Sequence, residues 1–314
     1  MEFRTKINIP VSPFKVTHQD RLLLMGSCFT ENIGHYLNRY QFATNINPFG
    51  IIYQPVSIFN NLKKVIKKEI YSAGDLLQNN GLYLSLDHHG QFSGTDQGKV
   101  LSTINASIDK AHADFNAARF IIITLGTAFV YKHLEQDRIV ANCHKIPNTA
   151  FEKRLLSMDE IKVAFNDVKD LLKDKTVIFT VSPVRHWRDG AVENQRSKSI
   201  LIASIHQLID EHNNCFYFPA YEIMMDELRD YRFYAEDMLH PNEVAVKYIW
   251  QRFAEAYFSE DTQHINVQLE KINSLLQHRI INTNTEAQTH FEQKVQNTIT
   301  AFKLKYPELA VNFR

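Results

Sequence analysis

The sequence predicts an α/β fold in which a mainly parallel sheet lies between two layers of helices. Short apolar runs of strand length alternate with longer segments of helical periodicity, a pattern typical of parallel sheets covered on both faces. Each apolar run is also closed by glycine or proline, as at a strand that ends in a turn. With 314 residues, of which 44% are hydrophobic, the chain can bury the large core that such a three-layer α/β/α sandwich needs.

Four apolar runs are predicted to be buried strands of this sheet. They are RLLLMG at 21–26, RFIIITLG at 119–126, TVIFTVSP at 176–183 and CFYFP at 215–219. The segment LYLSLDHHGQFSG at 82–94 is predicted to be a polar hairpin or loop inserted before the second of these strands.

Three amphipathic helices are predicted from apolar residues that recur at spacings of three and four. Ser157 and Glu160 form the signature of a capping box at the start of the second helix. The apolar faces consist of Phe29, Ile33, Leu37 and Tyr40 in the first helix, Ile161, Phe165, Val168, Leu171 and Leu172 in the second, and Val246, Ile249, Trp250, Phe253 and Tyr257 in the third.

The chain is predicted to consist of one domain over residues 1–258, with the sandwich itself over 15–258, and a C-terminal helical extension over 259–314. After residue 258 the composition changes, because Gln, Asn and Thr become frequent. Apolar positions are more widely spaced there, at Ile272, Leu275, Leu276, Phe291, Val295, Ile299 and Phe302. We expect two helices there that pack on the main domain or on a partner chain. In the second case the protein would be a homo-oligomer.

Charge and cysteine usage narrow the class of partner and the compartment. Lys plus Arg and Asp plus Glu both number 35, so no strong field draws the chain toward nucleic acid or a membrane surface. A small molecule or a glycan is the expected partner. Three cysteines do not make a disulfide framework and fit a reducing compartment. No segment has the apolar length of a signal peptide or membrane span, so we expect a cytoplasmic protein.

Two side chains that could act as nucleophiles follow the first predicted strand. Ser27 and Cys28 come directly after Gly26, at the expected start of a helix. Active sites of open parallel sheets form at the carboxyl ends of strands, and a helix N-terminus favours developing negative charge. The turn therefore suits a nucleophile. The alternative is an N-cap serine beside a small buried cysteine.

Asp237 and His240 stand three residues apart just before the helix that contains Val246. At this spacing a carboxylate can hold an imidazole in one tautomer while the other ring nitrogen faces a nucleophile, as in serine hydrolases. The alternative is a solvated loop whose aspartate caps the helix.

Together these stretches resemble the SGNH, or GDSL-like, hydrolase superfamily, in which a nucleophile after the first strand meets an Asp-x-x-His pair before the last helix. GSCF at 26–29 is similar to the signature of the GSCFA family, a bacterial branch grouped with that superfamily. Further similarities are NPFGIIYQP at 47–55, LGTAFVY at 125–131, VANCHKIP at 140–147, VSPVRHWRDG at 181–190 and AEDMLHPNE at 235–243, so the resemblance covers most of residues 15–258.

The resemblance implies an esterase or acyltransferase that acts on an acyl ester, with Asp237 orienting His240 as the base. Its register places Cys28 at the nucleophile position and Ser27 one residue before it. The third superfamily block normally carries an asparagine that binds the oxyanion, but the chain has Ala128 there, beside Gly126 and Thr127. Replacement donors are expected from Gly50, Thr127, Asn142 or His144, although Asn142 and His144 also suit ordinary turn chemistry. The missing amide equally suits an inactive binding or scaffold protein.

Further polar residues follow the third predicted strand or cluster in the predicted hairpin. Arg185 and His186 precede Trp187, and such a group could form a platform for a sugar or an anionic acyl donor, or an ordinary surface loop. Asp87, His88 and His89 form the best local cluster of metal-ligand types, but adjacent histidines in a polar loop are more often solvated than ligating. We expect no metal and no cofactor.

Overall fold

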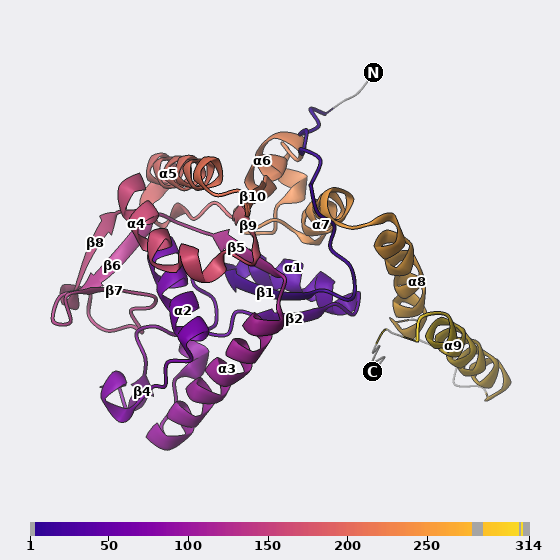
Figure 1. Cartoon of the computed structure of the whole chain (residues 1–314), viewed down its shortest axis with the longest axis horizontal. Helices are drawn as coiled ribbons and strands as arrows, with labels where there is room; N and C mark the ends of the chain where they lie inside the picture. The colour runs from indigo at the N-terminus through magenta and orange to yellow at the C-terminus, as the bar shows by residue number, and fades with distance from the viewer. Residues whose placement is uncertain (1–3, 278–284, 308, 310–314) are drawn as a thin grey trace.

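A five-stranded parallel sheet forms the centre of the molecule (Figure 1). The computed structural model describes residues 4–277, 285–307 and 309. The strands lie in the order β10-β9-β5-β1-β2, and every neighbouring pair is parallel. Their bounds are Arg21–Gly26 for β1, Ala43–Ile46 for β2, Phe120–Leu125 for β5, Thr176–Val181 for β9 and Cys215–Phe218 for β10.

Helices cover both faces of this sheet, which confirms the predicted three-layer sandwich. Leu23 and Met25 of β1 point into one apolar core, and Leu22 and Leu24 point into the other. The first core is closed by α2 (Pro55–Lys67), α3 (Gln97–Ala117), α4 (Met158–Lys169) and α5 (Gly190–Glu211). The second is closed by α1 (Cys28–Arg39), α7 (Glu243–Tyr257), α8 (Glu260–Gln277) and α9 (Thr285–Lys305), with the short α6 (Ala220–Glu222).

The four predicted strands are confirmed, whereas β2 and a second sheet escaped prediction. β3 (Leu77–Asn79) and β4 (Leu82–Leu84) form a hairpin, and of its two strands only β4 lies within the segment predicted at 82–94. A separate antiparallel sheet contains β6 (Phe129–His133), β7 (Arg138–Val140) and β8 (Phe151–Leu155) in the order β7-β6-β8. Sequences such as FEKRL are half polar because one face of this sheet is exposed, so they lack the continuous apolar run of a central strand.

The predicted helices are confirmed with one adjustment at the end of the second. Ser157 and Glu160 make the capping box of α4. That helix ends at Lys169, and in the following turn Leu172 is buried while Leu171 is 39% exposed.

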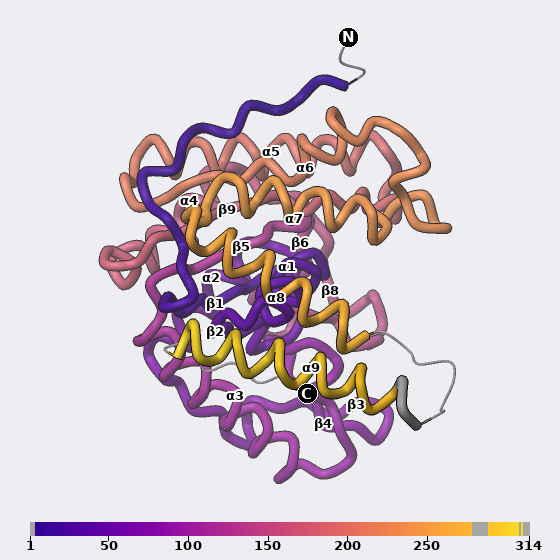
Figure 2. The backbone as a smooth tube through the Cα atoms, turned by 90° about the vertical axis from the view of Figure 1, so that its right-hand side faces the viewer, coloured from indigo at the N-terminus to yellow at the C-terminus, as the bar shows by residue number. Residues whose placement is uncertain are grey.

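The C-terminal helices pack on the α1 side of the sandwich (Figure 2). Leu269 and Ile272 of α8 lie in the second core, and Glu270 accepts from Arg39 at 3.1 Å and from the Tyr40 hydroxyl at 3.0 Å. Figure 1 shows α8 and α9 at the end of the molecule opposite the β6–β8 sheet. Of the predicted extension, residues 278–284, 308 and 310–314 lie outside the described residues. The division into domains at 258 stays a prediction.

Within the described residues, no helix is both long and apolar enough to cross a membrane.

Candidate active site

The turn after β1 lies where the direction of the chain through the sheet reverses. From β1 the chain proceeds to β2 on one side and then returns to β5 on the other, and crevices for ligands form at such a switch point. Gly26 has a φ of +146°, and a Cβ there would lie 2.2 Å from the Thr124 carbonyl oxygen. Only glycine therefore lets the turn approach β5 closely enough for the Ser27 N–H to donate to that oxygen at 3.2 Å.

The two candidate nucleophiles of this turn differ in exposure. Ser27 is the N-cap of α1 and is fully buried, and its Oγ accepts from the Phe29 N–H at 3.3 Å. Cys28, the first residue of the helix, is partly exposed. Burial raises the pKa of the Cys28 thiol, while the N–H groups of Phe29 and Cys28 and the charge of Lys198 act in the opposite direction. The helix N-terminus thus opposes the effect of burial without overcoming it.

Lys198 of α5 is a fully buried cation beside this turn that sequence reasoning missed. Its Nζ donates to the carbonyl oxygens of Gly126 and Ser182, both at 2.8 Å, which are the groups that follow β5 and β9. Burial lowers the pKa of Lys198 to about 7, and the charge of Cys28 acts against that shift. The signal was available, because Lys198 stands on the same helical face as Leu201, Ile205 and Leu208, an unusual place for a lysine.

The loop after β2 passes the switch point, and its oxygen atoms accept hydrogen bonds from several backbone N–H groups there. Asn47 Oδ1 accepts from the Gly26 N–H at 2.9 Å, and the Gly50 N–H donates to the Asn47 carbonyl at 2.7 Å. The Tyr53 carbonyl accepts from the N–H groups of Gly126 at 2.7 Å and Thr127 at 3.1 Å. The amides of Gly50, Gly126 and Thr127 are therefore occupied within the fold, and a role of these residues in binding an oxyanion or substrate stays a prediction.

The side chain of Thr127 is also engaged within the fold. Its Oγ1 lies 3.0 Å from Ser197 Oγ and accepts from the Phe129 N–H at 3.0 Å. Ser197 in turn accepts from the N–H of Ala128, which is buried.

Asp237 and His240 form a preorganised pair in the loop before α7. Asp237 Oδ2 lies 2.5 Å from His240 Nδ1, while Oδ1 accepts from the N–H groups of Leu239 at 2.9 Å and His240 at 3.0 Å. These bonds lower the pKa of Asp237 to about 2, the His240 N–H contributing most. The carboxylate thus faces Nδ1 of the imidazole, and Nε2 is the ring nitrogen left for a reacting group.

Aromatic contacts connect this pair with the loop at the switch point. The His240 ring lies 6.3 Å from the ring of His186, which in turn lies 5.4 Å from that of Tyr53. The Arg185 N–H also donates to the Leu239 carbonyl at 3.4 Å. Burial raises the pKa of Tyr53, with the charge of Cys28 as the next contribution. The loops after β1, β2, β5 and β9 and the Asp237–His240 turn thus share one edge of the sheet.

His186 contacts the rings of both His240 and Tyr53. Its Nε2 is buried and has no hydrogen-bond partner among the described residues. Burial, followed by the charges of Lys198 and His240, lowers the pKa of His186 to about 4. The imidazole is therefore neutral at physiological pH.

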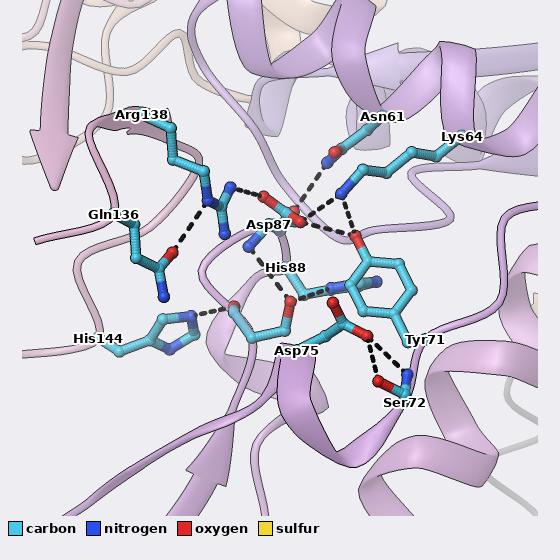
Figure 3. A network of polar contacts seen from close by, with 11 residues as sticks. Asn61, Lys64, Tyr71, Ser72, Asp75, Asp87, His88, Gln136, Arg138 and His144 are labelled. Carbon is cyan, nitrogen blue, oxygen red and sulfur yellow. Dashed lines mark hydrogen bonds and ion pairs between the residues drawn. The ribbon is translucent and has the colours of Figure 1, made fainter.

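Asn142 and His144 lie beside the segment that contains Ser85, and the contacts of their side chains are made there. Asn142 Oδ1 accepts from the His144 N–H at 2.9 Å, as in an Asx turn, and His144 Nε2 lies 2.8 Å from the Ser85 carbonyl oxygen. Figure 3 shows His144 beside the charged network around Asp87. A catalytic role for either residue stays a prediction.

Asp87 organises that network (Figure 3). It pairs with Lys64 and Arg138, both at 2.5 Å, and accepts from the Tyr71 hydroxyl at 2.7 Å. Burial would raise the pKa of Asp87, but the two cations hold it well below its usual value. The adjacent pocket, of about 1000 Å³, is lined by acidic and basic residues in equal number.

The histidine beside Asp87 is not solvated, contrary to the prediction. His88 is fully buried and stacks on Phe49 with ring centroids 4.4 Å apart. Its apolar neighbours were not visible in the polar composition of the segment. Across residues 4–277, 285–307 and 309, no group of three or more His, Cys, Asp or Glu side chains is arranged to hold a metal ion.

The architecture defines a doubly wound α/β protein with a candidate nucleophile at its switch point. The chain belongs to the GSCFA family, whose model matches residues 21–253. None of the curated proteins matches it. Among solved structures, the crystal structure of a GDP-L-fucose synthetase from Naegleria fowleri is 11% identical, with 97% of this chain and 99% of that chain covered. The TM-score of this match is 0.21.

Proposed function

We propose that this protein is an SGNH-type esterase or acyltransferase that acts on an acyl ester of a small molecule or glycan. The observation that carries the proposal is the Asp237–His240 pair, with 2.5 Å between Oδ2 and Nδ1, joined through His186 and Tyr53 to the loop at the switch point. An oriented imidazole near a nucleophile-bearing turn is the arrangement that acyl transfer requires.

Cys28 is the proposed nucleophile. Its partial exposure supports it over Ser27, whose side chain is buried and caps α1. In the proposed reaction, Sγ forms a bond to the acyl carbon as His240 accepts the thiol proton. Collapse of the tetrahedral intermediate breaks the ester bond, and the same proton passes to the leaving alcohol. Water or a sugar hydroxyl then attacks the resulting thioester, the C–S bond breaks, and the proton of the attacking hydroxyl passes through His240 to Cys28 Sγ.

The test is intact-mass spectrometry after incubation with p-nitrophenyl acetate. We expect one acetyl adduct on the wild type and none on Cys28→Ala. In His240→Ala, acetylation slows by about 10²–10⁴-fold because general-base assistance is lost. Cys143→Ala is the matched control, since Cys143 is the other partly exposed free thiol. An adduct that persists in Cys28→Ala and disappears in Ser27→Ala would transfer the role to Ser27.

A binding or scaffold protein is the second candidate function. The engaged amides of Gly50, Gly126 and Thr127 favour it, because none is free to bind an oxyanion as the loop stands. Stabilisation by glycans without an adduct or turnover would support this candidate. Ester hydrolysis that is abolished by His240→Ala would reject it.

We further propose that the protein acts in the cytoplasm, which its three free cysteines support.

A further inference from the structure

A small pocket of about 230 Å³ adjoins the Asp237–His240 turn and combines arginine with aromatic side chains. Its wall includes Arg185, Trp187, Tyr231, Tyr234 and Met238. Whole ligand sites usually measure about 300–1,000 Å³, so this pocket fits one substituent of a larger molecule. Its position places that substituent next to His240.

The backbone ties this pocket to the candidate catalytic pair. Met238, which lines the pocket, stands between Asp237 and His240 and has a φ of 59°, a conformation that non-glycine residues adopt only at a cost. The turn is held by the two N–H groups that donate to Asp237 Oδ1. The Ala235 N–H donates to the His240 carbonyl at 2.7 Å. One short segment therefore builds both the pair and the pocket wall.

Within the described residues, Arg185 forms no ion pair, unlike the other arginine of this pocket wall. Its Nε is buried without a hydrogen bond in the part of the chain that the structure describes. Its guanidinium carbon lies 5.9 Å from the centroid of the Trp187 ring. The other charges of the wall are paired, Arg229 with Asp226 at 2.6 Å and Asp230 with Arg232 at 3.3 Å.

Two aromatic side chains and one methionine of this pocket wall are open to solvent. Trp187 is 51% exposed, Tyr231 75% and Met238 52%. The exposed rings provide a flat surface for contact with a ligand. The guanidinium of Arg185 beside them provides several N–H donors in a fixed, planar arrangement.

We infer that this pocket is a subsite for an anionic substituent, a carboxylate or a phosphate carried on a ring. The guanidinium of Arg185 would bind the anion through two parallel hydrogen bonds, and Trp187 and Tyr231 would cover the ring. As a substrate subsite the pocket rests on the proposed function, and it deepens that function by giving the class of substrate. As an anion site it does not depend on catalysis.

Binding is measured by isothermal titration calorimetry with glucuronate, glucose 6-phosphate and glucose. We expect at least one anionic sugar to bind, and glucose to bind at least about tenfold more weakly. The preference between glucuronate and glucose 6-phosphate identifies carboxylate or phosphate as the group. Fluorescence quenching locates the site, because the chain has two tryptophans and Trp250 is buried.

Three variants test the role of Arg185. Arg185→Gln weakens binding of the anionic sugar by about tenfold or more, and Arg185→Lys gives an intermediate loss because it keeps the charge without the fork. Arg196→Gln is the matched control, an exposed arginine outside the pocket wall that is paired with Glu193 at 2.8 Å, and it stays within about twofold of the wild type. Circular dichroism verifies that each variant is folded.

Equal binding of glucose and the anionic sugars, no binding of any of them, or unchanged affinity in folded Arg185→Gln would each overturn the inference. The outcome is separable from that of the proposed function. If Cys28→Ala and the wild type bind glucuronate equally but no acetyl adduct forms, the subsite stands and the proposed function fails. If the adduct forms and no anionic sugar binds, the subsite alone fails.

Discussion

Lys198 is the residue whose burial has the most direct chemical consequence. Because the pKa of Lys198 is lowered to about 7, its side-chain amine is neutral in a large share of the molecules near physiological pH and can accept a proton. In its charged form Lys198 stabilises a thiolate at Cys28, and the two groups titrate as a pair. The lysine thus opposes the rise in the pKa of Cys28 that burial causes.

Lys198→Met should therefore slow alkylation of Cys28 by iodoacetamide at pH 7, where a large share of Lys198 is charged, by about threefold or more, because the thiolate loses its cation. Peptide-resolved mass spectrometry measures the rate. Cys143 is an internal control in the same sample, since burial and Arg188 alone determine the shift of its pKa. Equal alkylation of Cys28 in the wild type and the variant would show that Lys198 serves only to hold the ends of β5 and β9.

Some of these residues could be found from sequence and others could not. Asp237 and His240 are three residues apart, so their contact is local and the spacing alone predicts it. Lys198, Tyr53 and His186 meet only after the sheet has assembled, because more than 130 residues separate Tyr53 from His186 along the chain. Periodicity identifies faces of single elements and does not specify which loops meet.

At the scale of elements, α1 depends on Ser27 for its start. The Ser27 side chain accepts from the Phe29 N–H, one of the donors that have no partner within the helix. We expect Ser27→Ala to lower the free energy of unfolding by about 1 kcal/mol, and Ser27→Gly by only a few tenths, because glycine is a tolerated N-cap. Urea denaturation followed by circular dichroism measures both values.

Cys28→Ala provides the comparison, because it leaves the cap in place and should cost less than Ser27→Ala. This pair of variants separates a structural serine from a reactive cysteine at adjacent positions. A stability unchanged by Ser27→Ala would mean that the bond to Phe29, at 3.3 Å, contributes nothing to the helix.

Elements buried on both faces were predictable, and elements buried on one face were not. The apolar run FIIITL of β5 has every residue buried, so composition alone identifies it. β2, with the sequence ATNI, is an edge strand that pairs only with β1, and its Thr and Asn are tolerated there. The sheet of β6, β7 and β8 likewise alternates too weakly to stand out from loop sequence.

At the scale of the whole molecule, three histidines whose pKa values are lowered by full or partial burial couple folding to pH. His18 stacks on Phe42 at 4.2 Å and lies 3.0 Å from the Tyr40 carbonyl, and burial lowers its pKa to about 4. Burial likewise lowers the pKa of His186 to about 4 and that of His88 to about 3. These residues lie in different parts of the fold, so their effects on stability should add.

The sign of the effect follows from proton binding. An unfolded histidine titrates near pH 6.5, so between about pH 6.5 and pH 4 the unfolded chain binds more protons than the folded one. The free energy of unfolding should therefore fall as the pH falls through this window, by up to about 3 kcal/mol for His18 alone. His18→Phe keeps the stack on Phe42 and removes the titration, so the free energy of unfolding of this variant should fall less steeply with pH.

Urea denaturation at pH 7.5, 6, 5 and 4.5 measures the slopes of both proteins. His264→Gln, which changes an exposed histidine, should retain the wild-type slope. Parallel slopes for the wild type and His18→Phe would contradict the assignment, because the acid sensitivity would then arise from other groups.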